Sequence, residues 1–183
     1  MKKVLRVPLN MEMSASPQIV RVAVRVKPDQ ATLVPEKRQE LTTEGGLDLR
    51  KGRDRLKQAV SRLKKAGVRV SLFIDPNPLQ IRLARDLEVP MIELHTGCYA
   101  GALTRKRREI LLRQLDEAAK KAQALGLIVA AGHGLDYDNV AEVVSISEVE
   151  ELNIGFSIVA RAVEVGFHQA VQEMAGLVHG GGR

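Results

Sequence analysis

Aromatic residues, cysteines and long apolar runs are all scarce in this chain of 183 residues. With three Phe, two Tyr and no Trp, the chain has few rings on which nucleic-acid bases could stack. Cys98 is the only cysteine, which excludes an internal disulfide, suits a reducing compartment and leaves this thiol without support as a nucleophile or ligand. There is no run of eighteen uncharged apolar residues, and the first ten residues contain no apolar signal segment. These absences predict a cytoplasmic protein.

Basic residues outnumber acidic ones, and the net charge is +6. This charge is compatible with nucleic acid, with an acidic surface or with small anionic substrates, and alone it does not choose among them. The basic residues lie mostly in two stretches with helical spacing, 50–65 and 105–121, where they are interleaved with Leu and Ala. That pattern is typical of a solvated helix face. We therefore expect neither a nucleic-acid partner nor a membrane partner.

The hydrophobic pattern alternates between short runs rich in β-branched residues and longer stretches with helical spacing, which indicates βα repeats around a parallel sheet. Strands are predicted at residues 5–12, 31–35, 68–75, 91–95, 127–131 and 151–159. Helices are predicted at residues 16–25, 54–65, 79–87, 104–125, 137–145 and 162–178. The length suits a single α/β domain, either a (β/α)8 barrel or an open doubly wound sheet.

Polar or glycine-rich residues follow most of the predicted strands. They are Glu12, Glu36, the run from Glu93 to Gly97, Gly132-His133-Gly134 and Asn153-Ile154-Gly155. Each alone is compatible with a satisfied strand end. Because both candidate folds bring the carboxyl ends of their strands together, the repetition predicts one convergent site.

The connection after the second predicted strand is unusually long. Residues 33–49 read LVPEKRQELTTEGGLDL, with many charges and two glycines before the next helix begins. Connections in compact α/β units are usually short, so this one favours a lid over a polar ligand. A solvated surface excursion is the alternative.

Glu93, His95 and His133 are the candidates for proton transfer. Glu93 and His95 are two residues apart, so on a strand they project to the same face, either as a catalytic pair or as a hydrogen-bonded core pair. His133 lies between two glycines, which allow a ligand to approach the backbone closely. His133 is therefore a stronger candidate than the pair of Glu93 and His95.

Two kinds of ligand are compatible with these strand ends. Glu12, Glu93, His95 and His133 have the donor atoms of a zinc or iron site, but the chain has no HExxH or other close pair of ligands, and we expect no metal and no other cofactor. Backbone amides beside Gly134 and Gly155 suit an anion, because barrels often bind phosphate at their last strands. A phosphorylated substrate is therefore favoured.

Six segments, in order, strongly resemble the pyridoxine 5′-phosphate synthase family: NMEM, LVPEKRQELTTEGGLDL, SLFID, IELHTGCYA, AAGHGLDYDNV and ELNIGFSIVARAV. The resemblance extends from Asn10 to about Met174 and implies a TIM-type (β/α) barrel that forms a homo-oligomer. It also implies the condensation of 3-amino-2-oxopropyl phosphate with 1-deoxy-D-xylulose 5-phosphate to pyridoxine 5′-phosphate, with release of phosphate and water.

The resemblance also implies a role for each matching residue. Glu12 resembles a proton acceptor, His133 a proton donor and Glu93 a group that stabilises charged intermediates. Thr42 resembles a contact to the deoxyxylulose phosphate. Gly134, Gly155 and the residue after it, Phe156, resemble the pocket for the aminooxopropyl phosphate.

Two features depart from the family pattern. Phe156 stands where the family commonly has histidine, so only the backbone amide remains as a phosphate donor at that position. The Asn-x-Asp-His and His-x-Arg motifs of the family's first two strands do not occur before Asn10. We therefore expect an incomplete barrel with about six of eight strands that is unable to catalyse the reaction by itself. A non-catalytic remnant that binds phosphorylated ligands or stabilises a partner, and a metal-dependent barrel lyase, are the alternative functions.

Overall fold

A computed structural model describes residues 4–36 and 45–180 of the chain. Strands and helices alternate along the sequence, as the hydrophobic pattern predicts. The strands are β1 (Asn10–Met13), β2 (Gln30–Leu33), β3 (Arg69–Ile74), β4 (Met91–His95), β5 (Ile128–Gly132) and β6 (Val149–Asn153). The helices are α1 (Pro17–Val26), α2 (Arg53–Lys65), α3 (Pro78–Asp86), α4 (Gly97–Ala100), α5 (Arg105–Ala124), α6 (Val140–Val144), α7 (Phe156–Val165) and α8 (Phe167–Gly180).

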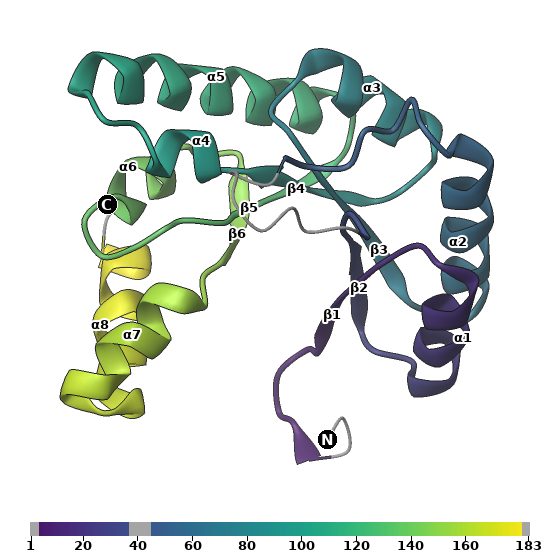
Figure 1. Ribbon diagram of the computed structural model, residues 1–183, viewed down its shortest axis with the longest axis horizontal. Coiled ribbons are helices and arrows are strands. Elements are labelled where there is room, and N and C mark those ends of the chain that lie inside the picture. Colours follow the sequence, from purple (N-terminus) through teal and green to yellow (C-terminus); the bar gives the residue numbers. More distant parts are fainter. Residues whose placement is uncertain (1–3, 37–44, 181–183) are drawn as a thin grey trace.

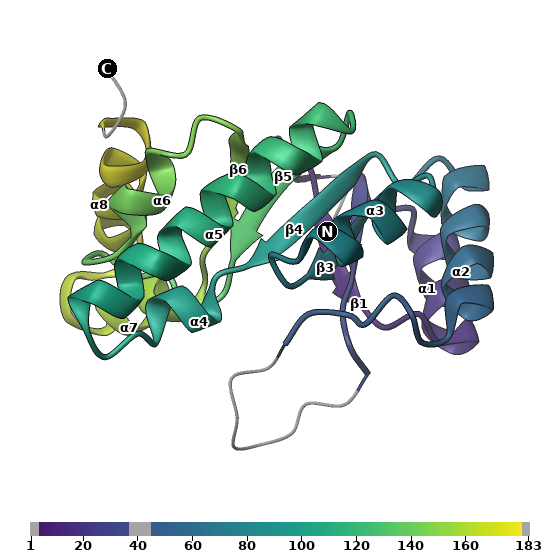
Figure 2. The ribbon, with the colours of Figure 1, turned by 90° about the horizontal axis from the view of Figure 1, so that it is seen from above.

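All strands pair in parallel, in the order β1-β2-β3-β4-β5-β6. A doubly wound sheet reverses its strand order at a switch point, whereas a barrel keeps the chain order, so this topology is that of a barrel. Helices α1, α2, α3 and α5 follow one another around the outside of the sheet, and α7 and α8 continue the arc beyond β6 (Figure 1). A second view shows α3, α4 and α5 along one side of the strands (Figure 2).

The sheet is strongly curved. The side-chain amide Nε2 of Gln30 on β2 donates to Oε1 of Glu151 on β6 at 3.4 Å, although three strands separate the two in the sheet order. In a flat sheet strands so far apart would be separated by roughly 19 Å, because neighbouring strands are about 4.8 Å apart. The contact therefore shows that the sheet curls into a partial barrel with side chains meeting across its interior.

Burial explains why the strands read as continuous apolar runs. Every residue of β2 and β4 is buried, since helices cover one face and side chains from other strands cover the opposite face. The helices contribute matching apolar stripes, which on α2 consist of Leu56, Ala59, Val60 and Leu63. Strand and helix residues pack in one hydrophobic cluster. In residues 4–36 and 45–180, no helix has both the length and the apolarity to cross a bilayer.

The predicted boundaries were wrong mainly at the two ends of the sheet. The strand predicted at 5–12 begins only at Asn10, and the strand predicted at 151–159 ends at Asn153. Phe156 opens α7 instead, because residues 156–165 place apolar side chains at helical intervals despite their β-branched content. The helix predicted at 162–178 is two helices, separated at Gly166, whose φ of +83° suits glycine. The short α4 was missed.

Candidate active site

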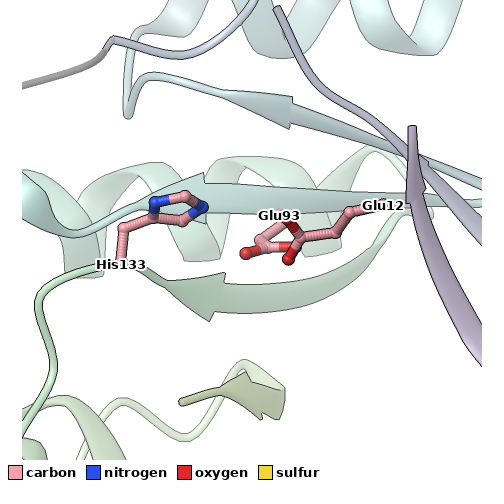
Figure 3. A group of neighbouring side chains, drawn as sticks. All are labelled: Glu12, Glu93 and His133. Carbon is pink, nitrogen blue, oxygen red and sulfur yellow. The ribbon is translucent and has the colours of Figure 1, made fainter. Parts of the chain in front are cut away.

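Three ionisable side chains from β1, β4 and the turn after β5 meet toward the carboxyl edge of the sheet. They are Glu12 on β1, Glu93 on β4 and His133 directly after β5, and one carboxylate or imidazole atom from each lies within 4.8 Å of the others. Figure 3 shows the two carboxylates beside each other, with the imidazole of His133 on their far side from β1. The sequence prediction that strand ends converge on one site is therefore confirmed for these residues.

Glu93 is the buried member of this group, with only 1% of its surface exposed. Its Oε2 accepts a hydrogen bond of 2.8 Å from Nδ2 of Asn153, while Oε1 has no hydrogen-bond partner among the described residues. Burial raises the pKa of Glu93 from 4.5 to about 7, and the neighbouring charge of Glu12 adds to the shift. Glu93 can therefore exchange a proton near neutral pH.

The glycine before His133 makes room for Glu93. A Cβ at Gly132 would lie 2.5 Å from Oε1 of Glu93 and 3.0 Å from the carbonyl oxygen of Asn153, so a larger residue would displace the buried carboxyl. The sequence had indicated ligand approach as the reason for this glycine. The structure adds a second reason, the close packing of β4, β5 and β6 around one carboxyl group.

His133 has an unusual backbone conformation for a residue with a side chain, with φ of +77°. The hydroxyl oxygen of Thr96 lies 2.6 Å from both the Gly132 and His133 carbonyl oxygens, and its single O–H is shared between these two acceptors, which holds this turn in place. The imidazole packs on Phe73 with ring centroids 4.3 Å apart. Strained backbone of this kind persists only where surrounding contacts hold it, and it commonly marks functional positions.

His95 lies on the interior side of β4, as its spacing from Glu93 predicts, but it is not grouped with Glu12 and Glu93. Its Nδ1 lies 3.1 Å from Oδ1 of Asp75. Its ring is nearly perpendicular to that of His133, and the two ring centroids are 5.7 Å apart. Sequence reasoning missed Asp75. Its signal was present, because this acid directly follows β3 just as His133 directly follows β5.

A cavity of about 950 Å³ lies against this group. Its lining comes from β1, the loop after β5, the end of β6 and the start of α7. It consists of Asn10, Glu12, His133, Gly134, Leu135, Asp136, Asn153, Ile154, Gly155, Phe156, Ser157 and Ala160. Gly134 has φ of +74°, and Gly155 is the N-cap residue of α7. Phe156 leaves 90% of its surface exposed. The structure thus brings the predicted Gly134, Gly155 and Phe156 to one cavity, whereas Thr42 lies outside the described residues.

The same group offers ligand atoms for a metal. Carboxylate oxygens of Glu12 and Glu93 and an imidazole nitrogen of His133 are common donors for divalent cations. His95, the fourth residue considered for such a site, directs Nδ1 to Asp75 instead.

A curved parallel βα sheet with acid–base side chains and a glycine-lined cavity at its carboxyl edge defines a (β/α)-barrel enzyme. Residues 1–180 match the family model described as Pyridoxal phosphate biosynthesis protein PdxJ. The chain belongs to this family.

Curated relatives agree with the family match. A pyridoxine 5′-phosphate synthase from Geobacter sp. (strain M21) is 48% identical over 97% of this chain and 74% of its own length. One from Synechococcus sp. (strain WH7803) is 51% identical over 97% of this chain and 72% of its own length. The chain thus spans about three quarters of the length of these relatives.

Solved structures support the fold. A tryptophan synthase α-subunit from Pyrococcus furiosus superimposes with a TM-score of 0.66 at 12% identity, covering 98% of this chain and 69% of that chain. At this identity the similarity concerns the barrel architecture alone.

Proposed function

We propose that this protein is a pyridoxine 5′-phosphate synthase that condenses 3-amino-2-oxopropyl phosphate with 1-deoxy-D-xylulose 5-phosphate. Identity of 48% to a relative of that name supports the activity. The observation that carries the proposal is the grouping of Glu12, Glu93 and His133 within 4.8 Å beside one cavity. Imine formation, enolisation, elimination and ring closure are successive proton transfers, which acids and bases at this spacing can serve.

Each of the three side chains suits a different step. Glu12 is exposed at the cavity and serves as the proton acceptor. His133 is held rigidly by Thr96 and Phe73 and serves as the proton donor. Glu93 is buried with a pKa near 7, so it can stabilise a cationic intermediate as a carboxylate or donate a hydrogen bond as a neutral acid.

The phosphate of the aminooxopropyl substrate binds at Gly134, Gly155 and the amide of Phe156. Gly155 and Phe156 form the beginning of α7, where backbone N–H groups have no partner within the helix and attract anions. Phe156 offers no side-chain donor, so binding there depends on the backbone. Thr42, by resemblance, contacts the second phosphorylated substrate.

The substitution Glu12→Gln tests the proposal. It keeps the shape of the side chain and removes its basic oxygen, so turnover of the two phosphorylated substrates should fall by about 100-fold or more. The matched control is Glu109→Gln on α5, where the carboxylate forms an exposed pair with Arg105. Circular dichroism should show equal folding for both variants. Equal turnover of the Glu12 variant and the control would remove Glu12 from the mechanism.

A metal-dependent lyase is the second candidate, because the three ligand atoms within 4.8 Å are compatible with a bound cation. Elemental analysis of the purified protein and turnover before and after chelation distinguish the two. One metal ion per protein chain, together with loss of turnover when that metal is removed by a chelator, would favour the lyase. Full activity in the chelated protein is the expected result for the synthase.

We also propose that the protein forms a homo-oligomer in the cytoplasm. Large apolar side chains on α7 and at the start of α8 are exposed, among them Phe156, Val163 and Phe167 at 90%, 85% and 63%. The exposed, free thiol of Cys98 suits a reducing compartment. Light scattering of the purified protein and fractionation of cells test these two statements.

A further inference from the structure

We propose that Asp75 and His95 are positioning residues for His133. We also propose that Asp75 holds the end of the long β2–α2 connection in place, through its hydrogen bond with Gly46. The proposal rests on the function above only in giving His133 a part in the reaction. Contacts run from Gly46 through Asp75 and His95 to His133.

The first contact is the shared carboxylate oxygen of Asp75. Its Oδ1 accepts a 2.9 Å hydrogen bond from the backbone N–H of Gly46 and lies 3.1 Å from Nδ1 of His95. An ionised carboxylate can only accept hydrogen bonds, so Nδ1 of His95 carries the proton in this pair. The hydrogen bond with His95 is also the main cause that holds the pKa of Asp75 below its ordinary value. Burial opposes this shift to a smaller extent, and the backbone hydrogen bond from Gly46 lowers the pKa further. Asp75 is therefore ionised at neutral pH and can accept both hydrogen bonds.

The second contact is the packing of the His95 ring. Its surface is only 4% exposed, and a Cβ at Gly97 would overlap Nε2, so the ring fills the space beneath the turn into α4. Phe73 meets it edge-on with centroids 5.1 Å apart. With Nδ1 bound to Asp75 and the ring edges enclosed, His95 has one orientation.

The third contact is between the rings of His95 and His133. The imidazole of His133 rests on Phe73 and on His95, whose rings are 4.3 and 5.7 Å away. His95 does not line the cavity, whereas His133 does. His95 therefore acts on the reaction through the orientation of His133.

The returning segment is tied to the same end of β3. The N–H of Leu47 donates to the carbonyl oxygen of Phe73 at 2.8 Å, and a Cβ at Gly46 would overlap the backbone of Ile74. Asp75 is half-exposed, with 51% of its side chain accessible, so it is not needed to fill the core. Its position is explained by the two hydrogen bonds that it accepts.

The variants Asp75→Ala, Asp75→Asn and His95→Phe separate the contacts. Asp75→Ala removes the acceptor for both Gly46 and His95. Asp75→Asn retains one amide oxygen that can accept both hydrogen bonds. His95→Phe retains a ring of similar size against His133 without the bond to Asp75. The matched control is Asp86→Ala at the end of α3, where the carboxylate forms an exposed pair with Arg53.

Steady-state kinetics of the intact chain give the first measurement. Asp75→Ala and His95→Phe should each lower kcat by about 10-fold to 100-fold, the scale expected for a small misplacement of a catalytic group, with a smaller change in KM. Their effects should be non-additive in the double variant, because both break the same contact. Asp75→Asn should retain most of the wild-type kcat, and Asp86→Ala all of it.

Nitrogen NMR of the histidine side chains gives a readout that does not need turnover. In the wild type, His95 should be the tautomer with the proton on Nδ1, and the His133 resonances should move in Asp75→Ala. A change confined to KM, or unchanged His133 resonances in Asp75→Ala, overturns the proposal. If the wild type has no turnover, the proposed function fails, and the NMR result alone decides the positioning role. If Asp75→Ala does not fold, the tautomer of His95 in the wild type and in Asp75→Asn decides it.

Discussion

At the scale of single residues, Glu93 combines deep burial with an unpartnered carboxylate oxygen among the described residues. Its pKa is near 7 in the folded chain, against an ordinary value of 4.5. Between these values the unfolded chain releases the proton while the folded chain retains it. The contribution of Glu93 to stability therefore decreases as pH rises from about 4.5 to about 7, by on the order of 3 kcal/mol in total.

Glu93→Gln tests this carboxyl directly. Glutamine preserves an acceptor for Asn153 and does not titrate, so its free energy of unfolding should lack the decrease seen in the wild type. Chemical denaturation at pH 5 and pH 8 measures the difference in free energy of unfolding between the variant and the wild type. The contributions of the other titrating groups cancel in this difference, because both proteins share them. A constant difference at the two pH values would show that Glu93 titrates at its ordinary pKa.

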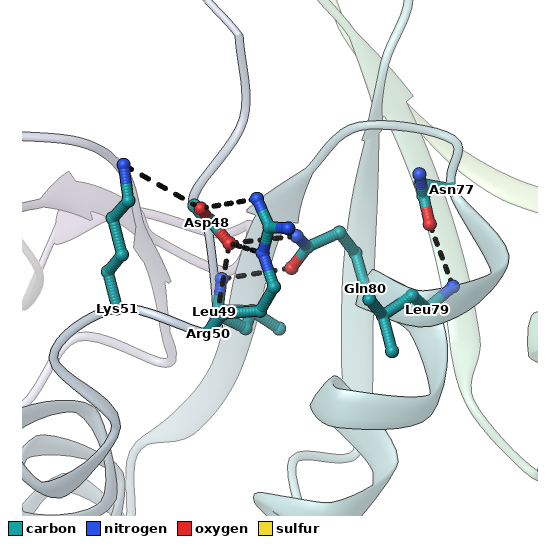
Figure 4. A network of polar contacts seen from close by, with 7 residues as sticks. All are labelled: Asp48, Leu49, Arg50, Lys51, Asn77, Leu79 and Gln80. Atoms are coloured by element: carbon teal, nitrogen blue, oxygen red, sulfur yellow. Dashed lines mark hydrogen bonds and ion pairs between the residues drawn. The ribbon is translucent and has the colours of Figure 1, made fainter.

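At the scale of elements, Gln80 joins α3 to the chain segment that leads into α2 (Figure 4). Its Oε1 accepts from the backbone N–H of Leu49 at 2.9 Å, and its Nε2 donates to Asp48 at 3.1 Å. Leu49 is fully buried, so its N–H has no access to water as a substitute partner. The Gln80 side chain thus satisfies a buried backbone group and fixes the segment that follows Gly46.

Gln80→Met should lower the free energy of unfolding by about 1–3 kcal/mol, because methionine has a similar length but leaves the Leu49 N–H unsatisfied. Asn77→Ala provides a comparison on the same helix. It removes the 2.8 Å N-cap hydrogen bond to Leu79 and should lower stability by about 1 kcal/mol. Urea denaturation measures both. A Gln80 variant as stable as the wild type would mean that water reaches Leu49.

At the scale of the whole molecule, anion binding and folding are linked, because only the folded chain assembles the proposed phosphate pocket from β5, β6 and α7. At a Kd of about 1 mM, phosphate at about 10 mM would add roughly 1.4 kcal/mol to the free energy of unfolding. The midpoint of thermal unfolding should therefore rise with phosphate concentration.

Gly134→Ala should remove this phosphate increment, since a Cβ there would lie 2.8 Å from that of Ala100, and relieving this overlap would shift the Gly134 backbone that lines the cavity. Gly126→Ala is the matched control, with a similar φ of +76° but no atom within 4 Å of the added Cβ. Both variants carry the strain of a positive φ, so the comparison isolates the pocket. Calorimetric titration with phosphate checks the result independently, and equal increments in the two variants would contradict an anion site at Gly134.

Particular residues show how far prediction from sequence reached. Strand β4 was predicted with its observed bounds, because its apolar run ends sharply at His95 and Thr96. Residues 156–159 were assigned to a strand because Phe, Ile and Val are common in strands, yet the helical spacing of this segment prevailed. Asp75 was missed because its importance depends on Gly46 and His95, which are distant in sequence.

The βα order, the polar residues near the strand ends and the resemblance to the family could all be predicted from the amino-acid order, because they depend on local composition and periodicity. Three features come from the folded chain alone: Glu12, Glu93 and His133 form one group, the carboxyl of Glu93 is the buried one, and His95 turns to Asp75. The physical reason is the curvature of the sheet. It brings together side chains from strands that would otherwise be far apart, and it sets the burial on which the pKa of Glu93 depends.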